Sequence, residues 1–188
     1  IKLSIDIELQ KYLYSVLKNK SGSIVAINVQ NGEIIGMTSA PSFDPNFFQQ
    51  GLSESEWESL SKDPLSPLVN KAISGEYSPG STFKMIVLLS AFKNKILKKN
   101  SSILSTSKFK LGDRTFYCWC HKKKTGCYAA RNRQRRVKPK LALAQSCDCF
   151  FYELARRIGI RKITDTALNF GMGKKTGINL QGESTGLV

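Results

Sequence analysis

The sequence has no apolar run long enough to cross a membrane, and no signal peptide opens its 188 residues. Neither end carries a polar tail, since the chain begins at Ile1 and stops at Val188. We therefore expect an excised part of a larger protein. The length suffices for one domain with its own hydrophobic core, and no internal repeat divides it.

Acidic residues are scarce, with 14 Asp and Glu against 29 Lys and Arg, which gives a formal net charge of +15. The excess is local, because residues 108–140 hold twelve basic residues and a single acid, Asp113. Charges nearly balance elsewhere, so a nucleic-acid-binding surface over the whole molecule is not indicated. The pattern predicts one basic insertion or loop, at 106–140, within a single partial domain spanning 1–188.

Histidine occurs once and cysteine five times. An odd number of cysteines argues against a framework of disulfides and favours metal ligands or free thiols. Four of these residues form a C-x-C-H-x5-C cluster: Cys118, Cys120, His121 and Cys127. Such residues suit zinc, but the spacing matches no standard zinc finger, and a solvated loop with reduced thiols is the alternative.

Apolar residues at helical spacing predict a helix within 3–17, which Ser4 and Asp6 can cap. Two β-rich runs, 23–29 and 33–38, flank Gln30-Asn31-Gly32 and predict a hairpin.

Further along the chain, helices alternate with irregular segments. We expect a short helix around 54–60, a buried helix over 82–92, mainly loop over 106–140, two helical pieces over 141–158, a short helix at 165–170 and a strand beginning at 178–180. The mixed order predicts an α+β fold in which helices pack on an antiparallel sheet.

Ser81-Thr82-Phe83-Lys84 is one of six Ser-x-x-Lys matches, and only this one joins a Pro79-Gly80 turn to an apolar helix. One helical turn separates the two residues, so Lys84 can take the proton of the Ser81 hydroxyl. An apolar helix would favour the neutral amine, and a helix N-terminus offers N–H groups to an oxyanion. In the alternative, Ser81 caps the helix and Lys84 is a surface lysine.

The segment 75–84 resembles the active-site segment of penicillin-binding proteins, the serine D,D-transpeptidases of cell-wall synthesis, and within them the class B, penicillin-binding protein 2 branch. The resemblance covers most of the chain in the family's order, through segments at 4–10, 23–34, 42–46, 68–72, 144–152 and 171–177. It implies the penicillin-binding protein and serine β-lactamase-like transpeptidase fold, truncated.

The family's second motif, Ser-x-Asn or Ser-x-Asp, matches Ser146-Cys147-Asp148. The resemblance implies that Ser146 lies near Lys84 and passes a proton to the leaving amine, while Asp148 orients the site. On its own, Ser-Cys-Asp would be an ordinary helix N-cap.

The third motif, Lys-Thr/Ser-Gly on an edge strand, has two matches that we reject. Lys124-Thr125-Gly126 precedes the second motif, and Lys175-Thr176-Gly177 follows it too soon. We expect the third motif beyond Val188, and therefore expect the isolated chain to be inactive and to react poorly with β-lactams.

The penicillin-binding protein 2 branch can carry a metal site, which the resemblance places at Cys118, His121 and Cys147. A structural zinc ion is therefore one expectation for this region. The family's reaction requires no cofactor.

The resemblance implies that Ser81 attacks the penultimate D-Ala carbonyl of a peptidoglycan stem peptide and that an amine of a neighbouring strand accepts the acyl group. The implied partners are stem peptides, β-lactams and cell-elongation proteins, with no nucleic acid. The implied location is the periplasmic face of the bacterial inner membrane, behind an anchor outside this chain. A catalytically incomplete or β-lactam-sensing domain and a basic, zinc-knuckle-like nucleic-acid-binding module are the alternatives.

Overall fold

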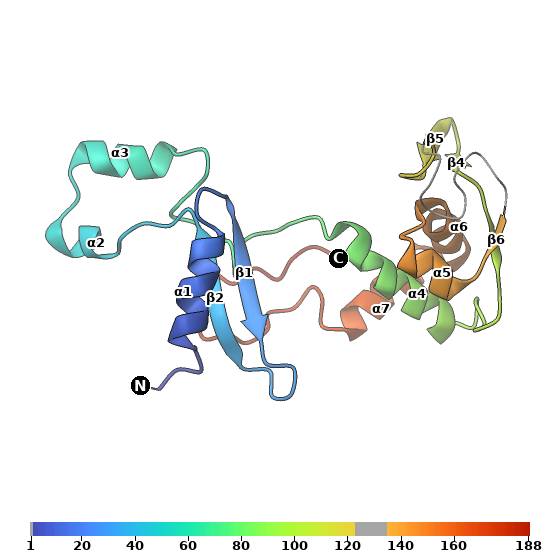
Figure 1. Cartoon of the computed structure of the whole chain (residues 1–188), viewed down its shortest axis with the longest axis horizontal. Helices are drawn as coiled ribbons and strands as arrows, with labels where there is room; N and C mark the ends of the chain where they lie inside the picture. Colours follow the sequence, from blue (N-terminus) through green and yellow to red (C-terminus); the bar gives the residue numbers. More distant parts are fainter. Residues whose placement is uncertain (1, 123–134) are drawn as a thin grey trace. The chain divides into compact units, whose positions relative to one another are not determined.

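The computed structural model describes residues 2–122 and 135–188. The chain divides into two compact units (Figure 1). The first unit runs to Tyr77 and includes Gly177–Ser184, and the second comprises Ser78–Thr176 with Thr185–Val188. In the described part, no helix combines the length and the apolar character that crossing a membrane requires.

The first unit is built on helix α1 (Ile7–Val16) and the antiparallel strands β1 (Gly22–Ile27) and β2 (Ile34–Ala40). This confirms the predicted helix and hairpin. Asp6 caps α1 by accepting from the Leu9 amide, whereas Ser4 donates to the Ile34 carbonyl instead of capping.

Helix α1 lies along the hairpin, and two features of the sequence fix it there (Figure 1). The Gln10 side-chain amide exchanges two hydrogen bonds with the Met37 backbone, at 2.6 and 2.8 Å. Gly36 allows the close approach, because a Cβ there would lie 2.7 Å from the Leu13 side chain. A polar side chain thus extends the hydrogen bonding of β2 where a helix covers it.

Two short helices complete the first unit: α2 (Asn46–Gln50) and α3 (Glu54–Lys62). Helix α3 confirms the prediction around residues 54–60. It begins at a capping box, in which Ser53 and Glu56 satisfy each other's backbone N–H groups.

The second unit begins with a 3-10 turn, η1 (Gly80–Phe83), which continues into α4 (Lys84–Lys93). The helix predicted over 82–92 is confirmed, but its burial is one-sided. Ile86, Val87 and Ala91 are buried, whereas Met85 and Leu89 are 53% and 43% exposed.

Helices α5 (Pro139–Ala144), α6 (Asp148–Ile158) and α7 (Ile160–Asn169) follow later in the chain. The predicted break near Ser146 separates α5 from α6, and α7 begins five residues before the predicted start at 165. Phe150 and Leu154 of α6 are fully buried in the core of this unit, which also takes in residues from α4, α5 and α7.

Four strands of the second unit lie where the sequence suggested mainly loop, or just before that stretch. They are β3 (Ile103–Ser105), β4 (Lys108–Leu111), β5 (Arg114–Tyr117) and β6 (Arg135–Val137), which pair antiparallel as β3 with β6 and β4 with β5. The loop prediction is wrong at β4, β5 and β6, whereas β3 lies before the predicted loop, and residues 178–180 form no strand. The α+β class is confirmed, with three two-stranded sheets among the described residues.

Candidate active site

The predicted nucleophile segment forms the start of the η1–α4 helix. Gly80 adopts φ +56°, a conformation that glycine tolerates best, and the chain then enters the 3-10 turn that carries Ser81. Residues three apart in a 3-10 turn project from the same side, so Ser81 and Lys84 face the same region. Ser81 is exposed, and the Lys84 side chain is 12% exposed.

The second motif occupies the turn between α5 and α6. The Cys147 amide donates to the Ala142 carbonyl at 2.9 Å, and the Ser146 amide donates to the Leu143 carbonyl at 3.0 Å. These two bonds are the Schellman motif, which ends a helix with a residue in the left-handed conformation. Ser146 is that residue, with φ +49°.

Lys84 meets this turn through three contacts. Its Nζ donates to Ser146 Oγ at 2.8 Å, to the Ser146 carbonyl at 3.0 Å and to Asp148 Oδ1 at 2.5 Å. Ser146 Oγ in turn donates to Ser81 Oγ at 3.0 Å. The structure therefore brings the four predicted catalytic residues together, and Ser146 lies between Lys84 and Ser81.

The surroundings of the Lys84 nitrogen are ionic as well as apolar. The Asp148 side chain that it contacts is 21% exposed, and the Phe151 ring centroid lies 5.7 Å away. The site therefore places a carboxylate against an amine for which the sequence suggested only apolar surroundings. Sequence spacing could not show this, because 64 positions separate the two residues.

Trp119 is a residue of this site that the sequence argument missed. Its backbone N–H donates to Asp148 Oδ2 at 3.0 Å, and its indole Nε1–H donates to the Gln145 carbonyl at 3.1 Å. The sequence marks Trp119 only as a lone aromatic residue between two cysteines, and neither contact is local in the chain.

Three buried thiols lie behind the second motif: Cys118, Cys147 and Cys149. Hydrogen bonds with Cys147 and Cys149 lower the pKa of the Cys118 thiol. The contact with Cys118, together with burial, raises the pKa of Cys147 and of Cys149. Cys120 is disulfide-bonded, so the expectation of free thiols or metal ligands is wrong for this cysteine, and Cys127 lies outside the described residues.

The predicted zinc ligands do not assemble as a metal site. His121 Nδ1 lies 2.8 Å from Ser107 Oγ, and the His121 ring packs on Tyr117 with the centroids 4.5 Å apart. Within residues 2–122 and 135–188, no group of three or more His, Cys, Asp or Glu side chains could hold a metal ion. The described residues therefore give no support to the zinc site that the resemblance implies.

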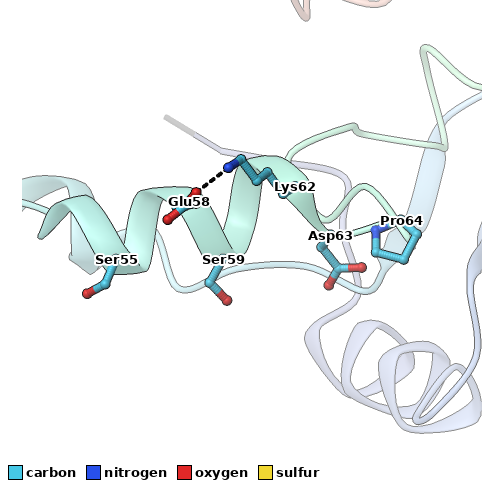
Figure 2. A pocket seen from close by; sticks show the side chains of 6 residues that line it. All are labelled: Ser55, Glu58, Ser59, Lys62, Asp63 and Pro64. Atoms are coloured by element: carbon cyan, nitrogen blue, oxygen red, sulfur yellow. Dashed lines mark hydrogen bonds and ion pairs between the residues drawn. The ribbon is translucent and has the colours of Figure 1, made fainter.

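Another Ser-x-x-Lys match, Ser59 with Lys62, shows that the spacing alone does not make an active site. Both lie on α3 in the first unit and line a shallow surface pocket with Ser55, Glu58, Asp63 and Pro64 (Figure 2). Lys62 pairs with Glu58 there, and the Ser59 hydroxyl makes no hydrogen bond within the described chain (Figure 2). Among the described residues, no hydrogen bonds connect Ser59 to Lys62, in contrast to the contacts through Ser146 that connect Ser81 to Lys84 at the candidate site.

The structure describes only one of the two rejected matches to the third motif. Lys124-Thr125-Gly126 lies outside the described residues. Lys175-Thr176-Gly177 forms no strand and spans the boundary between the two units.

The fold and the arrangement of the four residues together define a domain of the transpeptidase class. Penicillin-binding protein 2 of Pseudomonas aeruginosa, solved in complex with WCK 5153, matches with a TM-score of 0.83 and 30% identity over 99% of this chain and 40% of that chain. The complex between penicillin-binding protein 2 and MreC from Helicobacter pylori gives a TM-score of 0.85 and 30% identity, over 97% of this chain and 33% of that chain. The predicted fold is confirmed.

The chain belongs to the family described as "Penicillin binding protein transpeptidase domain", whose model matches residues 22–188. Peptidoglycan D,D-transpeptidase MrdA of Escherichia coli (strain K12) is 32% identical over 188 residues, which cover 99% of this chain and 28% of that protein. The Acinetobacter baumannii MrdA is 37% identical over 187 residues, covering 98% and 26%. The chain therefore spans roughly a quarter of the length of these curated relatives.

These findings confirm the predicted family, its penicillin-binding protein 2 branch and the assignment to serine-type peptidoglycan transpeptidases. They give no support to the nucleic-acid-binding alternative.

Proposed function

We propose that this chain carries the acylating serine of a peptidoglycan D,D-transpeptidase, with Ser81 as the nucleophile and stem peptides as the acyl donors. The observation that supports it most is the continuous series of contacts from Ser81 through Ser146 to Lys84 and Asp148. A serine hydroxyl becomes a useful nucleophile only when such a series can remove its proton.

In the acylation step, Ser81 Oγ bonds to the carbonyl carbon of the penultimate D-Ala. Its proton passes through the Ser146 hydroxyl to a neutral Lys84 amine. Hydroxyl hydrogens rotate, so the same Oγ–Oγ and Oγ–Nζ distances serve transfer in either direction. Asp148 stabilises the ammonium that results.

The proton then returns along the same path. Lys84 gives it through Ser146 to the nitrogen of the terminal D-Ala, the C–N bond breaks, and D-Ala leaves as an amine. An amine of a neighbouring strand attacks the acyl-enzyme and a peptide bond forms. The ester bond to Ser81 Oγ breaks, and the proton lost by the amine returns to Ser81 Oγ. No redox step or cofactor enters this sequence.

The relatives support a proposal for the partners and the location. The H. pylori structure is titled as a complex with MreC, and on that ground we assign this chain a partner in the cell-elongation machinery. The site faces the stem peptides, and hence the periplasmic side of the inner membrane. β-Lactams would occupy the same place as the stem peptide's acyl group.

A structural zinc ion at Cys118, His121 and Cys147 stays a prediction from the resemblance. Elemental analysis of the purified protein tests it, and zinc lost on replacing Cys147 by Ser would support it. The reaction proposed above runs without that ion.

Labelling with a fluorescent penicillin tests the proposed function, using the intact gene product. We expect stoichiometric acylation at Ser81, identified by peptide mass, and complete loss in Ser81→Ala. Ser59→Ala is the control. It removes the serine of the Ser-x-x-Lys pair on the exposed helix α3, and this variant should be labelled like the wild type.

Label that persists in Ser81→Ala would contradict the proposal, as would a folded wild-type protein that takes no label. Acylation without cross-linking of stem peptides would instead favour the β-lactam-sensing alternative.

A further inference from the structure

Trp119 contacts both sides of the turn that presents Ser146. Its indole N–H reaches the carbonyl of Gln145, the residue before Ser146. Its backbone N–H reaches the carboxylate of Asp148, two residues after Ser146. One residue that follows β5 therefore meets the turn between α5 and α6 on either side of the serine.

The turn needs support from outside. A left-handed conformation costs a non-glycine residue about 1–2 kcal/mol, and Ser146 occupies it where glycine is usual. Such a conformation persists only where its surroundings hold it in place. The two Schellman hydrogen bonds supply part of that restraint, through the N–H groups of Ser146 and Cys147.

The indole bond supplies the missing restraint. The Gln145 carbonyl and the Ser146 N–H belong to one planar peptide unit. The N–H end of that plane is held by the Leu143 carbonyl, and the C=O end is held by Trp119 Nε1 at 3.1 Å. A peptide plane held at both ends cannot rotate about its axis, and that rotation is what changes φ of Ser146.

Trp119 also fixes which oxygen of the Asp148 carboxylate faces Lys84. The Trp119 backbone N–H donates to Asp148 Oδ2, while Lys84 Nζ donates to Asp148 Oδ1. The carboxylate is thereby held with one oxygen toward the lysine, although 29 positions separate Trp119 from Asp148.

We propose that Trp119 is a positioning residue whose indole N–H, by fixing the peptide plane between Gln145 and Ser146, holds the Ser146 hydroxyl between Lys84 and Ser81. This inference rests on the proposed function, since the consequence to be measured is acylation of Ser81. Trp119 acts through Ser146 and makes no bond to the reacting atoms.

The test is Trp119→Phe in the intact gene product, because phenylalanine keeps an aromatic ring and removes the N–H donor together with one ring of the indole. The matched control is Trp57→Phe, which makes the same change at an exposed tryptophan on α3 in the other unit. Rates of labelling at several fluorescent penicillin concentrations separate the acylation rate constant from the dissociation constant of the initial complex.

We expect Trp119→Phe to lower the acylation rate constant about tenfold while the dissociation constant stays within twofold, as suits the loss of one hydrogen bond that positions Ser146. Amide hydrogen exchange at Ser146 and Cys147 should become at least several-fold faster. Trp57→Phe should change neither quantity.

An unchanged acylation rate constant in Trp119→Phe would overturn the inference. So would a variant that loses its fold throughout the second unit, because Trp119 would then be a general core contact. If the wild type takes no label at Ser81, the proposed function fails by itself, and hydrogen exchange at Ser146 and Cys147 still decides whether Trp119 holds the turn.

Discussion

Ser146 combines a chemical and a conformational role at one position. Its hydroxyl links Lys84 to Ser81, and its backbone ends α5 in the left-handed conformation. Glycine would suit the backbone better, but only a hydroxyl can continue the proton path. The site therefore places backbone strain where the proposed chemistry needs a side chain, as is common at functional sites.

Comparing Ser146→Gly with Ser146→Ala separates the two roles. Both remove the hydroxyl, and both should abolish labelling of Ser81. We expect the glycine variant to be more stable than the alanine variant by about 1 kcal/mol, because the left-handed cost of alanine exceeds the extra chain entropy that glycine brings to the unfolded state.

Urea unfolding of both variants measures that difference. Equal stabilities would show that the left-handed conformation of Ser146 costs the fold nothing. Retained labelling in either variant would remove the hydroxyl from the proton path.

The residues of the site were predictable in unequal measure. Ser81 with Lys84, and Ser146 with Asp148, lie three and two positions apart and match family motifs. The contacts that join the two pairs span more than 60 positions and depend on the packing of α4 against α6. The two bonds of Trp119 are of that long-range kind, so no local pattern could indicate them.

At the scale of elements, the hairpin of β4 and β5 packs its two phenylalanines on a tyrosine of α6. Phe109 and Phe116 are register partners, so their side chains share one face of the hairpin. Their ring centroids lie 5.7 and 5.6 Å from that of Tyr152. No hydrogen bond of the Tyr152 hydroxyl occurs among the described residues, and the contact is therefore one of aromatic packing.

Replacing Tyr152 tests how the hairpin is attached. Tyr152→Ala removes both ring contacts and should lower the free energy of unfolding by about 2–3 kcal/mol. Tyr152→Phe keeps the ring and should change it by less than about 0.5 kcal/mol. Urea unfolding gives both values, and hydrogen exchange in residues 108–117 should rise in the alanine variant.

A phenylalanine variant as unstable as the alanine variant would show that the hydroxyl, rather than the ring, holds the hairpin.

The hairpin of β4 and β5 also shows why the sequence predicted a loop where the structure has strands. The charge of the segment suggested a solvated loop, whereas Lys108–Leu111 alternates polar and apolar side chains in the period of a strand, and Arg114–Tyr117 contains Thr, Phe and Tyr, which favour strands. Gly112, with φ +56°, makes the turn between them. The earlier hairpin was predicted because its Asn-Gly turn joins two apolar runs, a stronger signal than Gly-Asp among lysines.

At the scale of the whole molecule, the first unit is completed by residues far along the sequence. The Ser184 amide donates to the Ile73 carbonyl at 2.9 Å, and Ser74 Oγ donates to the Gly182 carbonyl at 2.8 Å. The chain thus leaves this unit after Tyr77, forms most of the second unit, and returns with Gly177–Ser184. Stability of the first unit therefore depends on a segment that lies 108 positions beyond Ser74 in the sequence.

Gly182→Ala tests this division of the chain. Gly182 has φ +83°, and an added Cβ would be 3.5 Å from Ser74 Oγ, which is an ordinary contact. The alanine should therefore lower the stability of the first unit only through its backbone conformation, by about 1–2 kcal/mol. Gly171→Ala is the matched control, because Gly171 has φ +82° with nothing within 4 Å of its Cβ position and belongs to the second unit. Hydrogen exchange should accelerate at Ser184 and through β1 and β2 in the first variant, and through α7 in the second. Equal acceleration in both units by either variant would mean that they unfold as one, because a penalty confined to one cooperative unit leaves the protection of the other unchanged.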